Sequence, residues 1–212
     1  MNPLNPVNSG PSFWSPVVAG LVPYVPGEQP AVANLVKLNT NENPYPPSPR
    51  AQAAIRAATE QGLQLYPDPE STALRRTIAA QHGLAPEQVF VGNGSDEVLA
   101  HAFFAFFQQR GPLLVPDITY SFYQVYCGLY GIVQRVVPLD ATLRLDVEAF
   151  AVAEGQDVAG VVVANPNAPT GIGIPLAQIE RLLQLHPQRV VLVDEAYVDF
   201  GGETAMGLIS QY

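Results

Sequence analysis

The residues best suited to chemistry in this sequence follow runs of apolar, mostly β-branched residues. Asp194 and Glu195 come directly after Val190–Val193, a run typical of a strand buried on both faces of a parallel sheet. A carboxylate at the end of such a strand is costly to desolvate unless a cationic group meets it. In open α/β sheets, the C-terminal ends of the strands form the crevice where ligands bind. Asp194 is therefore the first candidate for a site residue.

A glycine-rich turn is the second candidate. Gly92–Glu97 reads Gly-Asn-Gly-Ser-Asp-Glu and separates a predicted strand, Val89–Val91, from a predicted helix. The free N–H groups and the positive end of such a helix suit a phosphate, although a well-capped helix start explains the turn equally well. A Walker phosphate loop is excluded, because that motif needs a lysine after its last glycine and the sequence has only Lys37.

Two further motifs follow predicted strands. Asn165–Gly171 reads Asn-Pro-Asn-Ala-Pro-Thr-Gly and leaves the apolar run Gly160–Ala164, while Tyr120 comes shortly after Leu113–Val115. Seen alone, the first is more often a simple turn and the second a packing aromatic. If all four motifs follow parallel strands, however, they meet at one edge of the sheet.

Strands and helices alternate along most of the chain. This order predicts an α/β fold, a three-layer sandwich with a mainly parallel sheet between helices. Residues 1–47 are rich in proline and lack periodicity, which predicts an extended N-terminal arm before a domain at 48–212. The predicted strands are 89–91, 113–115, 132–137, 160–164 and 190–193. The predicted helices are 48–62, 71–82, one that the turn 92–97 opens and that runs to about 109, 120–129 and 176–186, with a short helix capped by Asp146.

The composition narrows the class of protein. Hydrophobic residues make up 48% of the chain and the formal net charge is −9, which argues against nucleic acid or an anionic membrane as partner. The longest apolar stretch, Val98–Phe107, is too short to span a bilayer, and no basic residue precedes Lys37 as in a signal peptide. The single Cys127 fits a reducing cytoplasm. No spacing of histidine, cysteine and carboxylate residues indicates a metal site.

The four strand-end motifs, in this order, resemble the fold-type I pyridoxal-phosphate enzymes, and specifically the histidinol-phosphate aminotransferases. The resemblance covers nearly the whole chain. Its most specific points are Leu38–Pro44, Tyr66-Pro67, Gly92–Glu97, the Pro-Asn-Ala-Pro-Thr-Gly run and Asp194–Tyr197. It implies the large, pyridoxal-phosphate-binding domain of such an enzyme, a homodimer, and transfer of an amino group between glutamate and imidazole-acetol phosphate in histidine biosynthesis.

The resemblance also implies residue roles. Asp194 would pair with the pyridine nitrogen, Tyr197 would donate a hydrogen bond to the ring's phenolic oxygen, and Tyr120 would stack on the ring. The wider class has Asn where this chain has Ala168, so either Asn167 turns inward to bond the phenolic oxygen, which is the favoured expectation, or Tyr197 carries that bond alone. The cofactor phosphate would be held by Gly94, Ser95 and Asp96 and by Tyr66 of the partner subunit, and the substrate by Tyr24 and Asn43.

Other interpretations stay open from the sequence. An aromatic aminotransferase or a threonine-phosphate decarboxylase would keep every cofactor motif. A P-loop ATPase, with Asp194 and Glu195 serving a magnesium ion, and a non-catalytic binding module are more distant alternatives. The family's Schiff-base lysine and smaller C-terminal domain are expected beyond Tyr212. The 212 residues alone are therefore predicted to be inactive.

Overall fold

The computed structural model describes residues 13–22, 27–28, 30–32, 34–109 and 111–212. The chain divides into two compact units. One comprises Met1–Pro23 together with Gly94–Tyr212, and the other comprises Tyr24–Asn93. The larger unit contains the sheet and every predicted site residue from Gly94 to Tyr197. The boundary at residue 47 between an arm and a domain stays a prediction.

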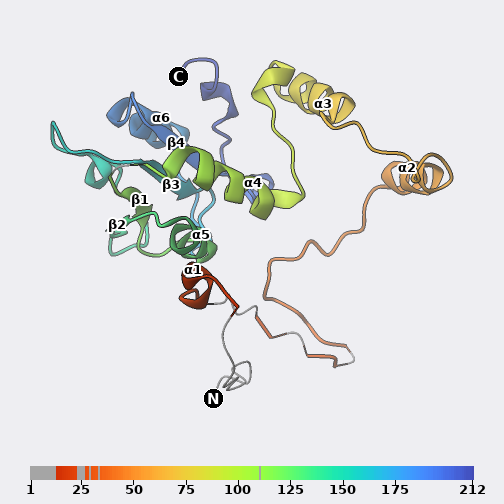
Figure 1. Ribbon diagram of the computed structural model, residues 1–212, viewed down its shortest axis with the longest axis horizontal. Coiled ribbons are helices and arrows are strands. Elements are labelled where there is room, and N and C mark those ends of the chain that lie inside the picture. Colours follow the sequence, from red (N-terminus) through yellow and green to blue (C-terminus); the bar gives the residue numbers. More distant parts are fainter. Residues whose placement is uncertain (1–12, 23–26, 29, 33, 110) are drawn as a thin grey trace. The chain divides into compact units, whose positions relative to one another are not determined.

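The larger unit is built on a sheet of four parallel strands in the order β2-β1-β3-β4. All four strands run in the same direction, so their C-terminal ends lie at one edge (Figure 1). The mainly parallel sheet predicted from the sequence is therefore confirmed. The strand bounds are β1 Leu113–Pro116, β2 Gln134–Val137, β3 Gly160–Ala164 and β4 Val190–Asp194.

The two central strands carry the core. Every residue of β1 and of β3 is buried, whereas β2 and β4, at the sheet edges, are only partly so. Gly160, at the start of β3, shows why a side chain is excluded there. A Cβ at this position would lie 2.6 Å from the Phe107 ring and 2.6 Å from the Val190 carbonyl oxygen. The glycine thus permits β3 to approach both its neighbouring strand and the helical layer.

Helical segments cover both faces of the sheet, which confirms the three-layer arrangement. One core cluster joins β1 and β3 to Leu99 of α4 and to aromatic residues of η2 and α5. The opposite cluster joins the sheet to η3, α6 and η5. The bounds are α4 Gly94–Ala102, η2 Phe103–Phe107 (a π-helix), α5 Phe122–Tyr130, η3 Val147–Phe150, α6 Leu176–Leu185, η4 Val198–Phe200 and η5 Met206–Leu208.

The smaller unit contains α2 (Pro49–Thr59), α3 (Thr72–His82) and η1 (Pro86–Gln88). Ser48 caps α2 by accepting a hydrogen bond from the Ala51 amide at 3.2 Å. Helix α3 ends at Gly83, which adopts the left-handed conformation that commonly terminates helices. Both helices were predicted from their capping residues, and both are confirmed to within a few residues.

The predicted strand Val89–Val91 is wrong. The segment pairs with no strand in the described part of the chain. The Val89 carbonyl instead accepts a hydrogen bond from Arg75 Nε at 2.8 Å, and the same guanidinium donates to the Pro86 carbonyl at 2.8 Å. A short apolar run predicts a strand only if a partner is available, and here an arginine satisfies the backbone.

The expectation of a wholly extended arm is also wrong in one place. Residues Pro16–Ala19 form a single helical turn, α1, which Ser15 caps at 3.3 Å through the Val18 amide. The Ser-Pro pair at its start is a typical helix-initiating signal. No helix in the described residues is long and apolar enough to cross a membrane.

Candidate functional site

A cavity of about 230 Å³ lies at the C-terminal edge of the sheet. Its walls come from segments that follow β1, β3 and β4 and from the start of α4, as expected for a parallel sheet. Small side chains leave space within the cavity, and polar side chains line the ends of the cavity. The lining residues are Ser95, Asp96, Tyr120, Ala164, Pro166, Ala168, Asp194, Ala196 and Tyr197.

One end of the cavity is the first turn of α4. Gly94 begins this helix with a φ of +81°, a conformation that glycine adopts without the steric cost that other residues meet. Ser95 and Asp96 follow in the turn, where backbone N–H groups have no partner within the helix. The positive end of the helix dipole adds to these donors, so this end of the cavity is suited to an anion.

The cavity also contains a carboxylate, that of Asp194, the last residue of β4. Its carboxylate accepts hydrogen bonds from the Tyr123 hydroxyl at 2.8 Å and from the Ala196 amide at 3.1 Å. Both partners are neutral, so the negative charge of Asp194 stays uncompensated in the described residues. A protonated nitrogen of a ligand would supply the missing positive charge.

Glu195 points elsewhere, although it adjoins Asp194 in the sequence. It accepts hydrogen bonds from the Thr204 hydroxyl and the Ala205 amide, both at 2.6 Å. This carboxylate therefore fixes the segment after η4 and does not line the cavity. The pairing of Asp194 with Glu195 that a P-loop ATPase would need is absent. No group of metal-ligating residues occurs in the part of the chain that the structure describes.

Two tyrosines complete the cavity. The Tyr120 hydroxyl donates to Asp96 Oδ1 at 3.1 Å, and the Tyr120 ring meets that of Tyr123 edge-on at a centroid distance of 5.4 Å. Asp96 and Tyr123 thus fix the position of Tyr120. Tyr197 lines the same cavity, and among the described residues its hydroxyl makes no hydrogen bond, which leaves that hydroxyl available to a ligand.

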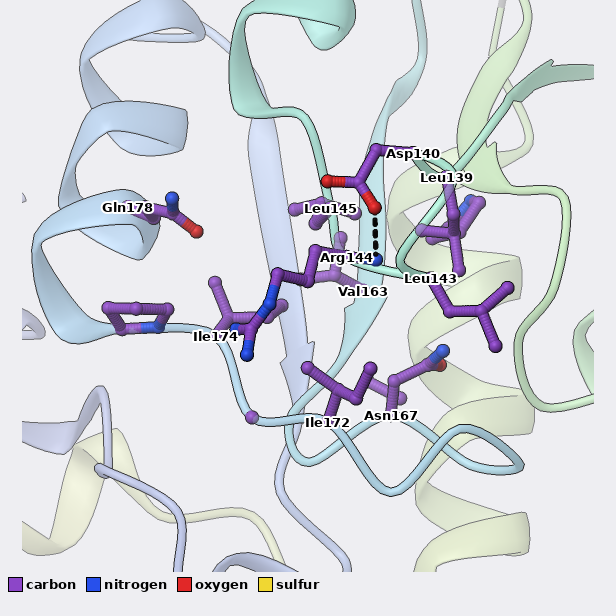
Figure 2. A pocket seen from close by; sticks show the side chains of 14 residues that line it. Leu139, Asp140, Leu143, Arg144, Leu145, Val163, Asn167, Ile172, Ile174 and Gln178 are labelled. Atoms are coloured by element: carbon purple, nitrogen blue, oxygen red, sulfur yellow. Dashed lines mark hydrogen bonds between the residues drawn. The ribbon is translucent and has the colours of Figure 1, made fainter.

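Asn167 is engaged outside this cavity. Its side chain donates to the Ile118 carbonyl at 2.9 Å and accepts from the Thr119 hydroxyl at 2.9 Å. It lines a second cavity of about 130 Å³, together with Arg144 and Ile172 (Figure 2). Ala168 lines the first cavity instead. Asn167 thus fixes the loop that carries Tyr120, and its hydrogen bond to a cofactor stays a prediction.

The remaining predicted residues lie elsewhere in the chain. Tyr66 and Asn43 belong to the smaller unit, where the Tyr66 side chain is fully exposed and Asn43 accepts a hydrogen bond from the Tyr45 amide at 2.9 Å. Tyr24 lies outside the described residues. The structure brings together Gly94, Ser95, Asp96, Tyr120, Asp194 and Tyr197.

Sequence reasoning missed two residues that organise the cavity. Tyr123 holds Asp194 and is only 1% exposed. Asn165 is fully buried, donates to the Glu203 carbonyl at 2.9 Å and accepts from the Ile174 amide at 2.8 Å. The spacing of Tyr123 three residues after Tyr120 was the available signal for the first. Nothing in the sequence distinguished the role of Asn165 from that of Asn167.

The arrangement can hold a ligand of defined chemistry. The helix end accepts an anionic group, Tyr120 offers an aromatic face, and Asp194 offers a carboxylate to a protonated nitrogen. The three alanines of the lining provide space for a flat ring. A phosphorylated pyridine fits this donor set, because it presents all three features in one molecule.

Comparisons with known proteins agree with this geometry. The family model described as aminotransferase class I and II matches residues 33–211. The chain is 62% identical to a histidinol-phosphate aminotransferase of Acetobacter pasteurianus and 58% identical to histidinol-phosphate aminotransferase 2 of Rhizobium meliloti. Both alignments cover 94% of this chain but only 55% and 56% of the relatives, so the chain spans about half their length.

The fold is also found in solved structures. The histidinol-phosphate aminotransferase of Sinorhizobium meliloti, solved in complex with pyridoxal-5'-phosphate, superposes with a TM-score of 0.71. It is 25% identical in sequence, and the match covers 90% of this chain and 53% of that one. The similarity thus extends from sequence to three-dimensional structure.

Proposed function

The chain belongs to the aminotransferase class I and II family, and from this we propose that it is the cofactor-binding part of a histidinol-phosphate aminotransferase. In the complete protein it binds pyridoxal 5'-phosphate and transfers an amino group between glutamate and imidazole-acetol phosphate. The observation that carries the proposal is the single cavity in which the start of α4, Tyr120, Tyr197 and Asp194 meet. The identity to named relatives supports the choice of substrate.

Each residue of the cavity has a definite task in this proposal. Bound pyridoxal phosphate supplies a conjugated ring that withdraws electrons from the substrate carbon. Asp194 keeps a proton on the ring nitrogen by placing a fixed negative charge beside it. Tyr120 packs against the ring, Tyr197 donates a hydrogen bond to the phenolic oxygen, and the first turn of α4 binds the phosphate. Tyr24 and Asn43 are proposed to contact the substrate.

Steady-state kinetics of the complete protein test the substrate. We expect kcat/KM with histidinol phosphate to exceed that with phenylalanine or tyrosine by about a hundredfold or more. A substrate site that recognises a phosphate group leaves its polar groups unpaired when the substrate has no phosphate. Threonine phosphate is expected to yield no carbon dioxide. A higher kcat/KM with an aromatic amino acid, or decarboxylation of threonine phosphate, would overturn the assignment while leaving the cofactor site intact.

We propose further that the complete protein is a cytoplasmic homodimer. The exposed Tyr66 supports the dimer, since a fully exposed tyrosine on a proline-flanked loop is available to a second subunit. The free and buried Cys127 is compatible with a reducing compartment. The net charge of −9 gives no reason to expect nucleic acid as a partner.

Mixed dimers test the role of Tyr66. A Tyr66→Ala subunit and an Asp194→Ala subunit, each with low activity alone, form hybrid dimers in which one site has both residues if Tyr66 acts across the interface. Random exchange would then restore about a quarter of wild-type activity, because half of the dimers are hybrids with one working site each. The control mixes Asp194→Ala with the double variant and restores nothing. Equal results in the two mixtures, with exchange demonstrated, reject the shared site.

A further inference from the structure

Two tyrosines on one face of α5 contact groups that belong to different walls of the cavity. Tyr123 and Tyr126 are three residues apart, so their side chains project from neighbouring positions on the same side of the helix. Both are buried, with exposures of 1% and 4%. Neither lines the cavity itself, and their hydroxyl groups nevertheless bond to residues that do.

Tyr123 holds the carboxylate of Asp194. Its hydroxyl donates to Asp194 Oδ2 at 2.8 Å, while the Ala196 amide donates to Oδ1. The ring is fixed by Phe103, at a centroid distance of 5.8 Å, and by the edge contact with Tyr120. Burial, and next the charge of Asp194, raise the pKa of the Tyr123 phenol far above its ordinary value. The phenol is therefore a proton donor throughout the physiological pH range.

Tyr126 holds the first turn of α4. Its hydroxyl donates to the backbone carbonyl of Asp96 at 2.8 Å. Burial, and next the charge of Asp96, raise the pKa of this phenol as well. Asp96 Oδ1 accepts a hydrogen bond from the Tyr120 hydroxyl at 3.1 Å and a longer one from Tyr126 at 3.5 Å. The backbone that would face an anion is thus tied to α5 and not only to its own helix.

We propose that Tyr123 and Tyr126 are positioning residues through which the single helix α5 fixes Asp194 and the first turn of α4 relative to each other. This inference rests on the proposed function, since these two groups would bind opposite ends of one cofactor. Their separation must match the length of a rigid ligand, and α5 is a rigid element in contact with both. Packing alone does not account for the hydroxyl groups, because phenylalanine would fill the same space without placing a polar atom in the core.

Hydrogen exchange of the cofactor-free complete protein tests each contact separately. In Tyr126→Phe, we expect the first amides of α4 that are hydrogen-bonded within the helix, those of residues 98–100, to exchange about fivefold faster, as for the loss of one hydrogen bond, with the Ala196 amide unchanged. In Tyr123→Phe, the Ala196 amide should exchange faster by a similar factor, and α4 should not change. Tyr130→Phe is the matched control, because Tyr130 lies on the same helix but has no hydroxyl hydrogen bond among the described residues.

Cofactor titration gives the second readout. Tyr126→Phe is expected to raise the Kd for pyridoxal phosphate about tenfold, and Tyr123→Phe to lower kcat by a similar factor at saturating cofactor, as for other residues that orient a primary ligand. If either variant matches Tyr130→Phe in both measurements, its positioning role is rejected. If the wild-type protein binds no pyridoxal phosphate, the proposed function fails, and the exchange pattern still decides whether α5 fixes the two groups.

Discussion

Replacement of Asp194 by alanine in the complete protein is expected to lower turnover by about a thousandfold, the effect of removing a preorganised charge from an active site. Asp194 ends β4 in the cavity, and its only described hydrogen-bond partners there are the neutral donors of Tyr123 and Ala196. Its negative charge is therefore available to keep a proton on the nitrogen of a bound pyridine ring. The measurement is kcat for transamination at saturating cofactor and substrate.

A second substitution separates the charge of Asp194 from its structural role. Asp194→Asn keeps an acceptor for the buried Tyr123 hydroxyl but removes the charge, so we expect turnover to fall nearly as far as in the alanine variant. Asp199→Asn serves as the control, because Asp199 is an exposed carboxylate in η4 that does not line the cavity. Near-normal turnover of Asp194→Asn would reject the role of its charge.

The polypeptide of residues 1–212, produced by itself, is expected to show no transamination and no covalent adduct with pyridoxal phosphate after borohydride reduction. Covalent attachment needs the amine of a lysine as nucleophile. The only lysine of these residues, Lys37, belongs to the smaller unit and forms an ion pair with Glu42, whose pKa it lowers. No lysine follows β4 within these residues. The measurement is the mass of the reduced protein together with glutamate-dependent turnover.

Two comparisons make this experiment decisive. The complete protein should give one adduct per chain under the same conditions, which shows that the reduction works. A Lys37→Arg variant of residues 1–212 reports any incidental reaction at Lys37. A stoichiometric adduct accompanied by turnover in the 212-residue polypeptide would contradict the prediction.

The centre of the sheet was predictable because β1 and β3 are short apolar runs that are buried throughout. Gly160–Ala164 is a strand with the predicted bounds, and all of its residues are buried. Val89–Val91 is also an apolar run, but it pairs with no strand in the described part of the chain, and composition does not reveal which apolar runs will find a partner strand. Long-range pairing, and not local preference, decides between these two cases.

Most residues that line the cavity could be predicted from the sequence, but the residues that hold them in place could not. Asp194, Tyr120 and Tyr197 follow strands, and the rule that ligands bind at strand ends was enough to group them. Tyr123 was predicted only as part of the helix 120–129, since its hydroxyl meets a carboxylate 71 residues away in the sequence. Asn167 and Ala168 illustrate the same limit. Adjacent residues face different cavities, and the direction depends on the path of the loop.

The strand order β2-β1-β3-β4 also has a consequence for the order of folding. Strands β1 and β2 are joined through α5 and strands β3 and β4 through α6, so each pair can form by closing a comparatively short loop, whereas the pairing of β1 with β3 closes a longer one. Closure of longer loops costs more entropy and is slower. Tyr123 follows β1 and Asp194 ends β4, so the two residues meet only when the β1–β2 and β3–β4 pairs have joined through β1 and β3. The walls of the cavity come from both pairs, so a bound cofactor stabilises the assembled sheet through mass action.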